Sequence, residues 1–216
     1  MSSAEQARRF WRCRIRSPPS LLRRVSVHEP ERHRSKSRKP LAAHYGIMTV
    51  MSSPPVELRA VQDADLQPLF EMYAAVVEDG DALPANGACM DVFLDGWIRN
   101  RSVFVAWSGD YIVGSYFVRS NFPAFAAHIA QGGYTVSRQA RRQGIGRFMV
   151  QDSLEQAARL GYTAMMFNLV LERNPSRSLY ERLGFKVIGR IPEAKADEDG
   201  IIYWRLLADI RHDRDR

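Results

Sequence analysis

The sequence of 216 residues predicts an α/β (α+β) fold with a mixed sheet. Segments with strand and helix patterns follow one another in the order βααβββαβαββ. A basic turn with two glycines, residues 141–147, joins a predicted strand to a predicted helix. The apolar run 164–171 has the length and composition of a buried strand. A chain of this length can form one domain with a sizeable core.

The first half of the pattern begins with a strand and two helices. Alternating apolar residues at 56–61 predict the strand, and Asp63 is a favourable N-cap for a helix over 64–78. A second helix is expected over 88–99. Segments 102–107 and 111–119 then predict a hairpin, because Ser108-Gly109-Asp110 between them is a strong turn signal.

The second half alternates strands with helices. A loop over 120–127 leads to a strand over 128–136 and to the basic turn. Apolar residues at helical spacing continue up to Gly161. After the run 164–171, Asn174 as N-cap and Pro175 at the first helical position predict a short helix, and a strand over 186–189 comes next.

The basic turn has the features of an anion site. Gly144 and Gly146 let backbone N–H groups approach a ligand, and the helix after them directs the positive end of its dipole to the same place. The spacing excludes a Walker loop and does not fit a dinucleotide fingerprint with three glycines. Taken alone, the turn could also be a tight basic turn without a ligand.

The turn, together with the apolar strand and short helix downstream of it, resembles the GNAT superfamily of acetyl-CoA-dependent N-acyltransferases. The matching residues, within about 56–207, are Arg141-x-x-Gly144-x-Gly146, Asn174 and Leu179-Tyr180-x-x-Leu183-Gly184-Phe185. A finer resemblance is to a fungal and bacterial branch that includes acetyltransferases for proline analogues. It rests on Phe167-Asn168-Leu169-Val170, on Asn174 and on Ile201-Ile202-Tyr203.

The resemblance implies one domain with a mostly antiparallel sheet of about six to seven strands and about four helices. It also implies acetyl-CoA as co-substrate and no metal. The residues expected to bind the cofactor come from the strand, the turn and the next helix: Tyr134, Thr135, Val136, Arg141, Arg142, Gln143, Gly144, Ile145, Gly146, Arg147 and Asn174. Asn174 stands six residues before Tyr180, whereas relatives usually have seven, and N-capping alone would also explain it.

Tyr180 and Asn168 are the expected catalytic residues. The resemblance gives Tyr180 the role of protonating the departing thiolate, although an aromatic side chain packed on the core would have the same pattern. Asn168 is an amide in an apolar strand and must find hydrogen-bond partners. The resemblance directs it to the substrate, and a bond to a neighbouring loop is the structural alternative.

The acceptor side is less defined. Gln131 stands where the branch often has Asn, and Gln131 and Glu78 are the expected substrate-binding residues. No Glu lies between Tyr111 and Val136, so a general base would be water, a backbone carbonyl or an acid near Glu78. His128 could serve on pKa grounds but is more often structural at a strand end.

The positive charge of the chain is confined to its beginning. The net charge is +7, yet residues 1–50 hold 12 Lys and Arg against 3 Asp and Glu, which leaves 19 against 21 in residues 51–216. We expect residues 1–50 to be a disordered leader. It could be a segment upstream of the true start, a transit peptide or a nucleic-acid-binding arm.

The remaining composition favours a cytoplasmic protein. Cys13 and Cys89 have no metal or disulfide spacing and are expected as reduced thiols, and no apolar run is long enough for a membrane helix. We therefore expect an N-acetyltransferase for a primary or secondary amine of a small molecule, such as an amino acid or a proline-like compound. A homodimer is a further expectation, and nucleic acid is not an expected partner. The alternatives are acetylation of a protein N-terminus or lysine, and a non-catalytic acyl-CoA-binding module with a nucleic-acid-binding arm.

Overall fold

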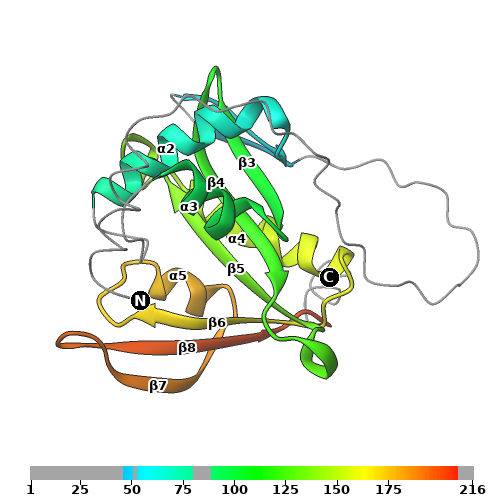
Figure 1. The fold of residues 1–216 in the computed structure, drawn as a ribbon, viewed down its shortest axis with the longest axis vertical. Helices are drawn as coiled ribbons and strands as arrows, with labels where there is room; N and C mark the ends of the chain where they lie inside the picture. Colours follow the sequence, from blue (N-terminus) through cyan, green and yellow to red (C-terminus); the bar gives the residue numbers. More distant parts are fainter. Residues whose placement is uncertain (1–45, 51–52, 80–88, 209–216) are drawn as a thin grey trace, which may run out of the picture.

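A mixed sheet in the order β1-β2-β3-β4-β5-β6-β8-β7 forms the centre of the computed structural model, which describes residues 46–50, 53–79 and 89–208 (Figure 1). Neighbouring strands are antiparallel except β5 and β6. The strands are β1 (Gly46–Val50), β2 (Ser53–Ala60), β3 (Ser102–Ser108), β4 (Tyr111–Ser120), β5 (Ile129–Val136), β6 (Ala164–Leu171), β7 (Lys186–Lys195) and β8 (Glu198–Leu206). The helices are α2 (Leu66–Glu78), α3 (Met90–Phe93), α4 (Ile145–Arg159) and α5 (Arg177–Arg182).

Helices cover both faces of the sheet. Helices α2 and α3 pack on one face of β3 and β4 through an aromatic cluster that includes Tyr73, Phe93 and Trp97 (Figure 1). Helix α4 packs on the other face, where Met149 and Leu154 join the larger core. The mixed sheet and the four helices confirm the predicted fold class.

The observed strands extend the prediction at both ends of the sheet. Strand β1 pairs antiparallel with β2, so Gly46–Val50 belongs to the sheet although it lies within the predicted leader. With β1 the sheet has eight strands, one more than the expected six to seven. Strand β7 reaches Lys195 rather than ending at Gly189, because its pairing with β8 continues through irregular register.

The first helix begins later than expected. Residues Asp63–Asp65 form a 3-10 turn, and the carboxylate of Asp65 accepts hydrogen bonds from Gln62 N at 2.7 Å and from Arg59 at 2.6 and 2.9 Å. Burial opposes ionisation of Asp65, but these hydrogen bonds hold its pKa below the ordinary value. Asp65 therefore anchors α2 to β2 in place of the expected Asp63.

The pairing of β5 with β6 is short and leaves most of the two facing strand edges unpaired with each other. The two strands pair in parallel only at Ile129–Ala130 with Ala164–Met165, and beyond these pairs they diverge (Figure 1). Strand β6 also has an irregularity against β8 between Phe167 and Val170, which places Asn168 at a bulge. We call the region beyond these pairs, where the facing edges of β5 and β6 are not paired with each other, the β5–β6 gap.

Three expectations concern features outside the sheet. Cys89 is disulfide-bonded and so differs from the expected reduced thiol. The chain's other cysteine, Cys13, lies outside the described residues. None of the helices in the described part of the chain is long and apolar enough to cross a membrane. The described residues also contain no group of His, Cys, Asp and Glu that could hold a metal ion.

Candidate active site at the β5–β6 gap

The basic turn forms a cradle of backbone N–H groups at one end of the β5–β6 gap. The chain leaves β5, passes through a 3-10 turn at Arg138–Ala140 and enters α4 at Ile145. Arg142 and Gly144 have positive φ angles of 64° and 82°. Alternation of such conformations turns successive N–H groups toward one side. Among the described residues, no backbone carbonyl accepts from the N–H groups of 142–147.

The space above Gly146 fits a ligand that approaches the backbone. A Cβ placed on Gly146 would meet only Val136 Cγ2, at 3.9 Å, within a 4 Å radius. The protein itself therefore leaves room at this position, and a side chain would fill it. Open N–H groups, the N-terminus of a 15-residue helix and a small residue together suit the diphosphate of CoA.

The side chains of the turn have different surroundings. Arg142 and Arg147 are exposed, whereas Ile145 is buried in the core and can offer a ligand only its backbone. Gln143 donates through Nε2 to the carbonyl of Gln139 at 3.1 Å. Arg141 lies 3.7 Å from Asp79 at the end of α2. The turn residues predicted to bind the cofactor are thus brought together, with Arg141 partly neutralised.

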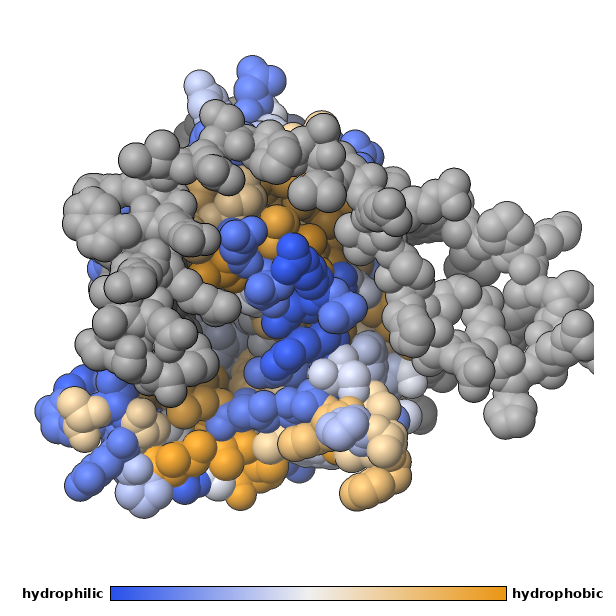
Figure 2. All heavy atoms as spheres, viewed as in Figure 1, coloured by the Kyte–Doolittle hydropathy of each residue, from blue (hydrophilic) through white to orange (hydrophobic). Residues whose placement is uncertain are grey.

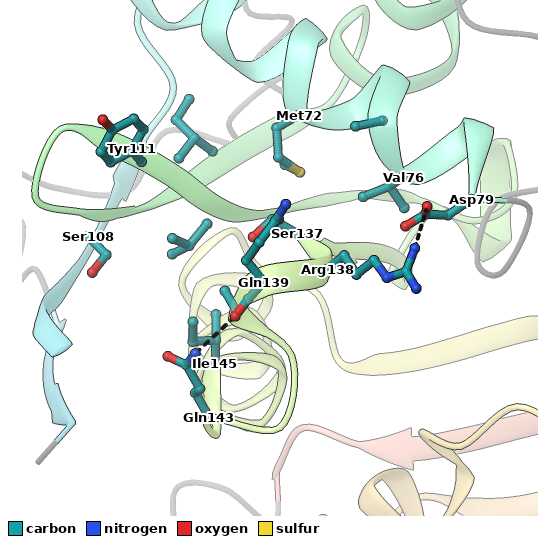
Figure 3. A pocket seen from close by; sticks show the side chains of 14 residues that line it. Met72, Val76, Asp79, Ser108, Tyr111, Ser137, Arg138, Gln139, Gln143 and Ile145 are labelled. Carbon is teal, nitrogen blue, oxygen red and sulfur yellow. Dashed lines mark hydrogen bonds and ion pairs between the residues drawn. The ribbon is translucent and has the colours of Figure 1, made fainter. Parts of the chain in front are cut away.

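Asp79 links the turn to α2 across a cleft. It also lies 3.5 Å from Arg138, and both side chains line a cleft of about 720 Å³ between α2, the β3–β4 hairpin and the turn (Figure 3). Gln143 and Ile145 reach this cleft, but Gln131, Asn168 and Tyr180 do not line it. The cleft therefore adjoins the N–H cradle on the α2 side without containing the predicted catalytic residues.

The backbone of β5 is available along the gap at alternate residues. The bonds from Asn121 N to Ile129 O (2.8 Å) and from Ser137 N to Val113 O (2.9 Å) show that odd-numbered residues of β5 face β4. The N–H and C=O groups of Tyr134 and Val136 therefore point toward the gap. Thr135 bonds toward β4, and its side chain is buried, so it is not placed to contact a ligand in the gap.

Tyr180 lies in the aromatic core on the α4 side of the sheet. Its ring centroid is 4.8 Å from that of Phe167 and 5.9 Å from that of Tyr203. Burial raises the pKa of Tyr180 to about 12, and a hydrogen bond with Ser176 acts in the opposite direction. The hydroxyl is therefore protonated at neutral pH and can act as a hydrogen-bond donor, not as a base.

Asn168 and Gln131 lie on the opposite side of the gap and belong to one polar group. Asn168 and Asn121 form a reciprocal amide pair, with both N–O distances at 2.7 Å. Gln131 Oε1 accepts from Arg119 Nε at 2.9 Å and Nη2 at 2.6 Å. Arg119 and Gln131 share the sheet face of Phe117, which carries α2 and α3, and Asn121 follows Arg119 by two residues, so we treat the four side chains as one polar cluster. Asn168 thus has the loop bond expected of a structural residue.

Three predicted residues have other surroundings. Asn174 Oδ1 accepts from Ser176 N at 2.9 Å, and α5 begins at Arg177, two residues later than expected. The amide nitrogen of Asn174 remains for a ligand. Glu78 is exposed at the end of α2, and its side chain forms no hydrogen bond or ion pair with any described residue. The ring nitrogen Nδ1 of His128 lies 3.0 Å from Phe125 O, which agrees with a structural role.

Arg119 and Asn121 were not predicted as site residues. Arg119 stands at the end of a predicted strand and Asn121 in the following loop, and neither belongs to a recognisable motif. The only usable signal was the register of the β4–β5 pair, which sets Arg119 opposite Gln131. Asn121 reaches Asn168 across 47 residues of sequence, a contact that no local pattern predicts.

The chain is similar to known acetyltransferases in sequence and in fold. Residues 70–185 match the family described as Acetyltransferase (GNAT) family. "N-acetyltransferase aca1" of Schizosaccharomyces pombe is 38% identical over 84 residues, which cover 38% of this chain and only 40% of that protein.

Two solved structures have the same fold. A GCN5-related N-acetyltransferase from Kribbella flavida has a TM-score of 0.65 and 28% identity, and the similarity covers 70% of this chain and 97% of that one. A phosphinothricin acetyltransferase from Sinorhizobium meliloti in complex with AcCoA has a TM-score of 0.60 at 21% identity, covering 70% and 88%. The chain belongs to the acetyltransferase (GNAT) family.

Proposed function

We propose that this protein transfers the acetyl group of acetyl-CoA to a primary or secondary amine of a small molecule by direct attack. The observation that carries the proposal is the β5–β6 gap, which has the N–H cradle at one end and the polar cluster with Asn168 and Gln131 beside it. The phosphinothricin acetyltransferase from Sinorhizobium meliloti, a structural neighbour, supports a small molecule as acceptor.

The two faces of the sheet would hold different reactants. The cradle and Tyr180 belong to the side covered by α4 and α5, whereas Asn168 and Gln131 belong to the side of α2 and α3. The cofactor would therefore reach the gap from one side and the amine from the other. Backbone groups of Tyr134 and Val136 along the gap would align the pantetheine arm. Alignment of two reactants can lower the activation free energy by about 7–11 kcal/mol.

Tyr180 would stabilise the sulfur that leaves. Bound acetyl-CoA supplies the thioester that the amine attacks. The phenol of Tyr180, with a pKa of about 12, is a weaker acid than a free thiol with a pKa of about 8.5. Complete proton transfer to the thiolate is therefore uphill, and Tyr180 would act mainly by donating a hydrogen bond. Such a bond to a charged group contributes about 1.5–3 kcal/mol.

Among the described residues, no carboxylate is placed to take the proton of the amine. Gln131 and Asn168 do not titrate, and Asp79 is engaged by Arg138 and Arg141. Turnover should therefore rise with pH until the amine itself is mostly unprotonated. A general base with a pKa near 7 would instead give a plateau well below the pKa of the amine.

Release of CoA thiol from acetyl-CoA, measured with a panel of amines and with protein N-terminal and lysine peptides, tests the proposal. We expect release with small amines and little with peptides. Release only with peptides would favour a protein acetyltransferase. Binding of acetyl-CoA without any release would favour a sensor. Salt-dependent DNA binding that disappears without residues 1–45 would assign the basic segment to nucleic acid. The cytoplasmic location and the homodimer stay predictions.

A further inference from the structure

Arg119 and Arg101 form a basic pair on the face of the sheet that carries α2 and α3, with Arg119 opposite β5 and Arg101 behind it over β4. Figure 2 shows this face, with hydrophilic residues (blue) gathered near its centre. Arg119 stands opposite Gln131 in the β4–β5 register, and Phe117 stands opposite Gly133 next to them. The guanidinium carbon of Arg101 lies 5.0 Å from the centre of the Phe117 ring. Burial lowers the pKa of Arg101, and repulsion by Arg119 adds to this effect.

The packing at Gly133 holds Arg101 close to the strand. A Cβ on Gly133 would lie 2.4 Å from the Phe117 ring, so only glycine lets this ring cover β5. Trp97 packs edge-on against the same ring at 5.0 Å. Arg101 is therefore held on an aromatic surface next to Arg119, and it is half-buried there.

Neither guanidinium has a carboxylate partner among the described residues. Arg119 uses two of its five N–H groups on the neutral oxygen of Gln131. Arg101 donates through Nη1 to the carbonyls of Asp95 and Arg99 at 2.8 and 2.6 Å, and its Nε is buried without an acceptor. The side chain of Asp95 influences Arg101 from a distance but is largely exposed and pairs with Arg99.

This lack of partners distinguishes the pair from most other arginines of the described chain. Arg59, Arg138, Arg173 and Arg190, for example, lie within 4.0 Å of an Asp or Glu oxygen. Two half-buried positive charges without counter-ions are unfavourable unless an anion joins them. The unused N–H groups of a guanidinium match the two oxygens of a carboxylate.

The anion cannot be the diphosphate at the turn. Five residues of extended strand separate Gln131 from Val136, which corresponds to about 17 Å, and the N–H cradle lies beyond Val136. The acceptor is the reactant expected on this face, next to Asn168 and Gln131. We infer that Arg119, supported by Arg101, binds a carboxylate on the acceptor, so that the substrate is an amino or imino acid; this inference rests on the proposed function.

Matched acceptors that differ only in this group test the inference. L-leucine, L-leucinamide and 3-methylbutylamine form one set, and L-proline, L-prolinamide and pyrrolidine form another. We expect the full-length protein to have a kcat/KM for the better acid at least about 10-fold above that for its amide. The amine of the amide has a lower pKa than the amine of the acid, so a larger fraction of the amide is unprotonated and reactive. This difference alone would favour the amide, so a higher kcat/KM for the acid cannot result from it.

Variants assign the preference to Arg119. In Arg119→Gln the ratio of kcat/KM for acid over amide should fall to about 1, and Arg119→Lys, which keeps the charge but loses the fork, should retain part of the ratio. Arg182→Gln, an exposed arginine on α5, is the charge-matched control and should keep the wild-type ratio. Unfolding curves and acetyl-CoA affinity show whether each variant is folded.

A measurement on the wild-type protein avoids any dependence on folding of the variants. 4-Methylpentanoate, the acid without the amine, should inhibit competitively against leucine, and 4-methylpentanamide should inhibit at least about 10-fold more weakly. An amide used as well as the acid, equal inhibition by the two compounds, or an unchanged ratio in Arg119→Gln would overturn the inference. Absence of turnover with every amine would instead refute the proposed function itself.

Discussion

The substitution Gly146→Ala tests ligand binding and protein stability at the turn separately. Gly146 lies in the first turn of α4, and its added Cβ would have one neighbour, Val136 Cγ2 at 3.9 Å. Exchange of glycine for alanine at a strain-free helical position stabilises a protein by about 0.4–1 kcal/mol. We therefore expect the free energy of unfolding of the unliganded protein to rise by this amount.

The same methyl group would weaken binding of acetyl-CoA. It would occupy the space through which a phosphate approaches the N–H groups, and each lost hydrogen bond to a charged group costs about 1.5–3 kcal/mol. Loss of one bond corresponds to a Kd about 10- to 150-fold higher. Isothermal titration calorimetry with acetyl-CoA measures the affinity, and urea unfolding measures the stability.

Gly144→Ala is the matched control in the same turn. Gly144 has a φ of 82°, so alanine there should destabilise the protein by about 1–2 kcal/mol. The two substitutions should thus change stability in opposite directions. Unchanged acetyl-CoA affinity in Gly146→Ala would refute the placement of the diphosphate at the cradle. A large loss of stability in Gly146→Ala would refute the open space at that position.

Four further predictions concern single contacts. Tyr180→Phe should lower kcat about 10- to 100-fold with little change in acetyl-CoA affinity. Burial raises the pKa of Tyr180 to about 12, so ionisation of this residue should not lower the turnover of the wild type below about pH 11. Asn168→Ala should lower kcat about 100-fold or more and leave acetyl-CoA binding within about threefold, whereas loss of both in calorimetry would indicate a structural role. Burial raises the pKa of Asp152 despite a hydrogen bond from Tyr116. The stabilising effect of protonated Asp152 is therefore fully present below the unfolded pKa of about 3.9 and is lost as the pH rises through the folded pKa. Asp152→Asn should raise the free energy of unfolding at pH 8 and should raise it by a smaller amount at pH 4. Removal of residues 1–50 should cost about 1–4 kcal/mol more than removal of residues 1–45, because it deletes the cross-strand pairs of β1 with β2, and equal urea midpoints for the two shortened proteins would contradict this.

Local patterns were enough to predict most of the fold. Alternation, caps and the turn at Gly109 each depend on a few neighbouring residues, and these predicted the hairpin, α4 and β6 close to their observed bounds. The errors occur where a distant partner decides the outcome. Arg59 and Gln62 hold Asp65, so α2 starts at Leu66. Strand β1 depends on its pairing with β2, which the local sequence does not reveal. The prediction used composition alone and therefore assigned Gly46–Val50 to the leader.

The site was predictable only where a motif spans adjacent residues. The turn with Gly144 and Gly146 carries its backbone geometry in its own sequence, and its N–H cradle was expected. The direction of Thr135 toward β4 depends on strand register, which the sequence leaves open by one residue. The pairs Asn121–Asn168 and Arg119–Gln131 join segments that are distant in sequence, and they decide which side chains face the acceptor.

A crystal structure of the protein with acetyl-CoA would show directly whether the cradle and the β5–β6 gap hold the cofactor. We expect diphosphate oxygens at about 2.7–3.2 Å from N–H groups of residues 142–147, with the pantetheine arm along the Tyr134 and Val136 edge of β5 and the thioester in the β5–β6 gap. A diphosphate bound in the cleft between Asp79 and Tyr111, or a thioester outside the gap, would contradict this placement.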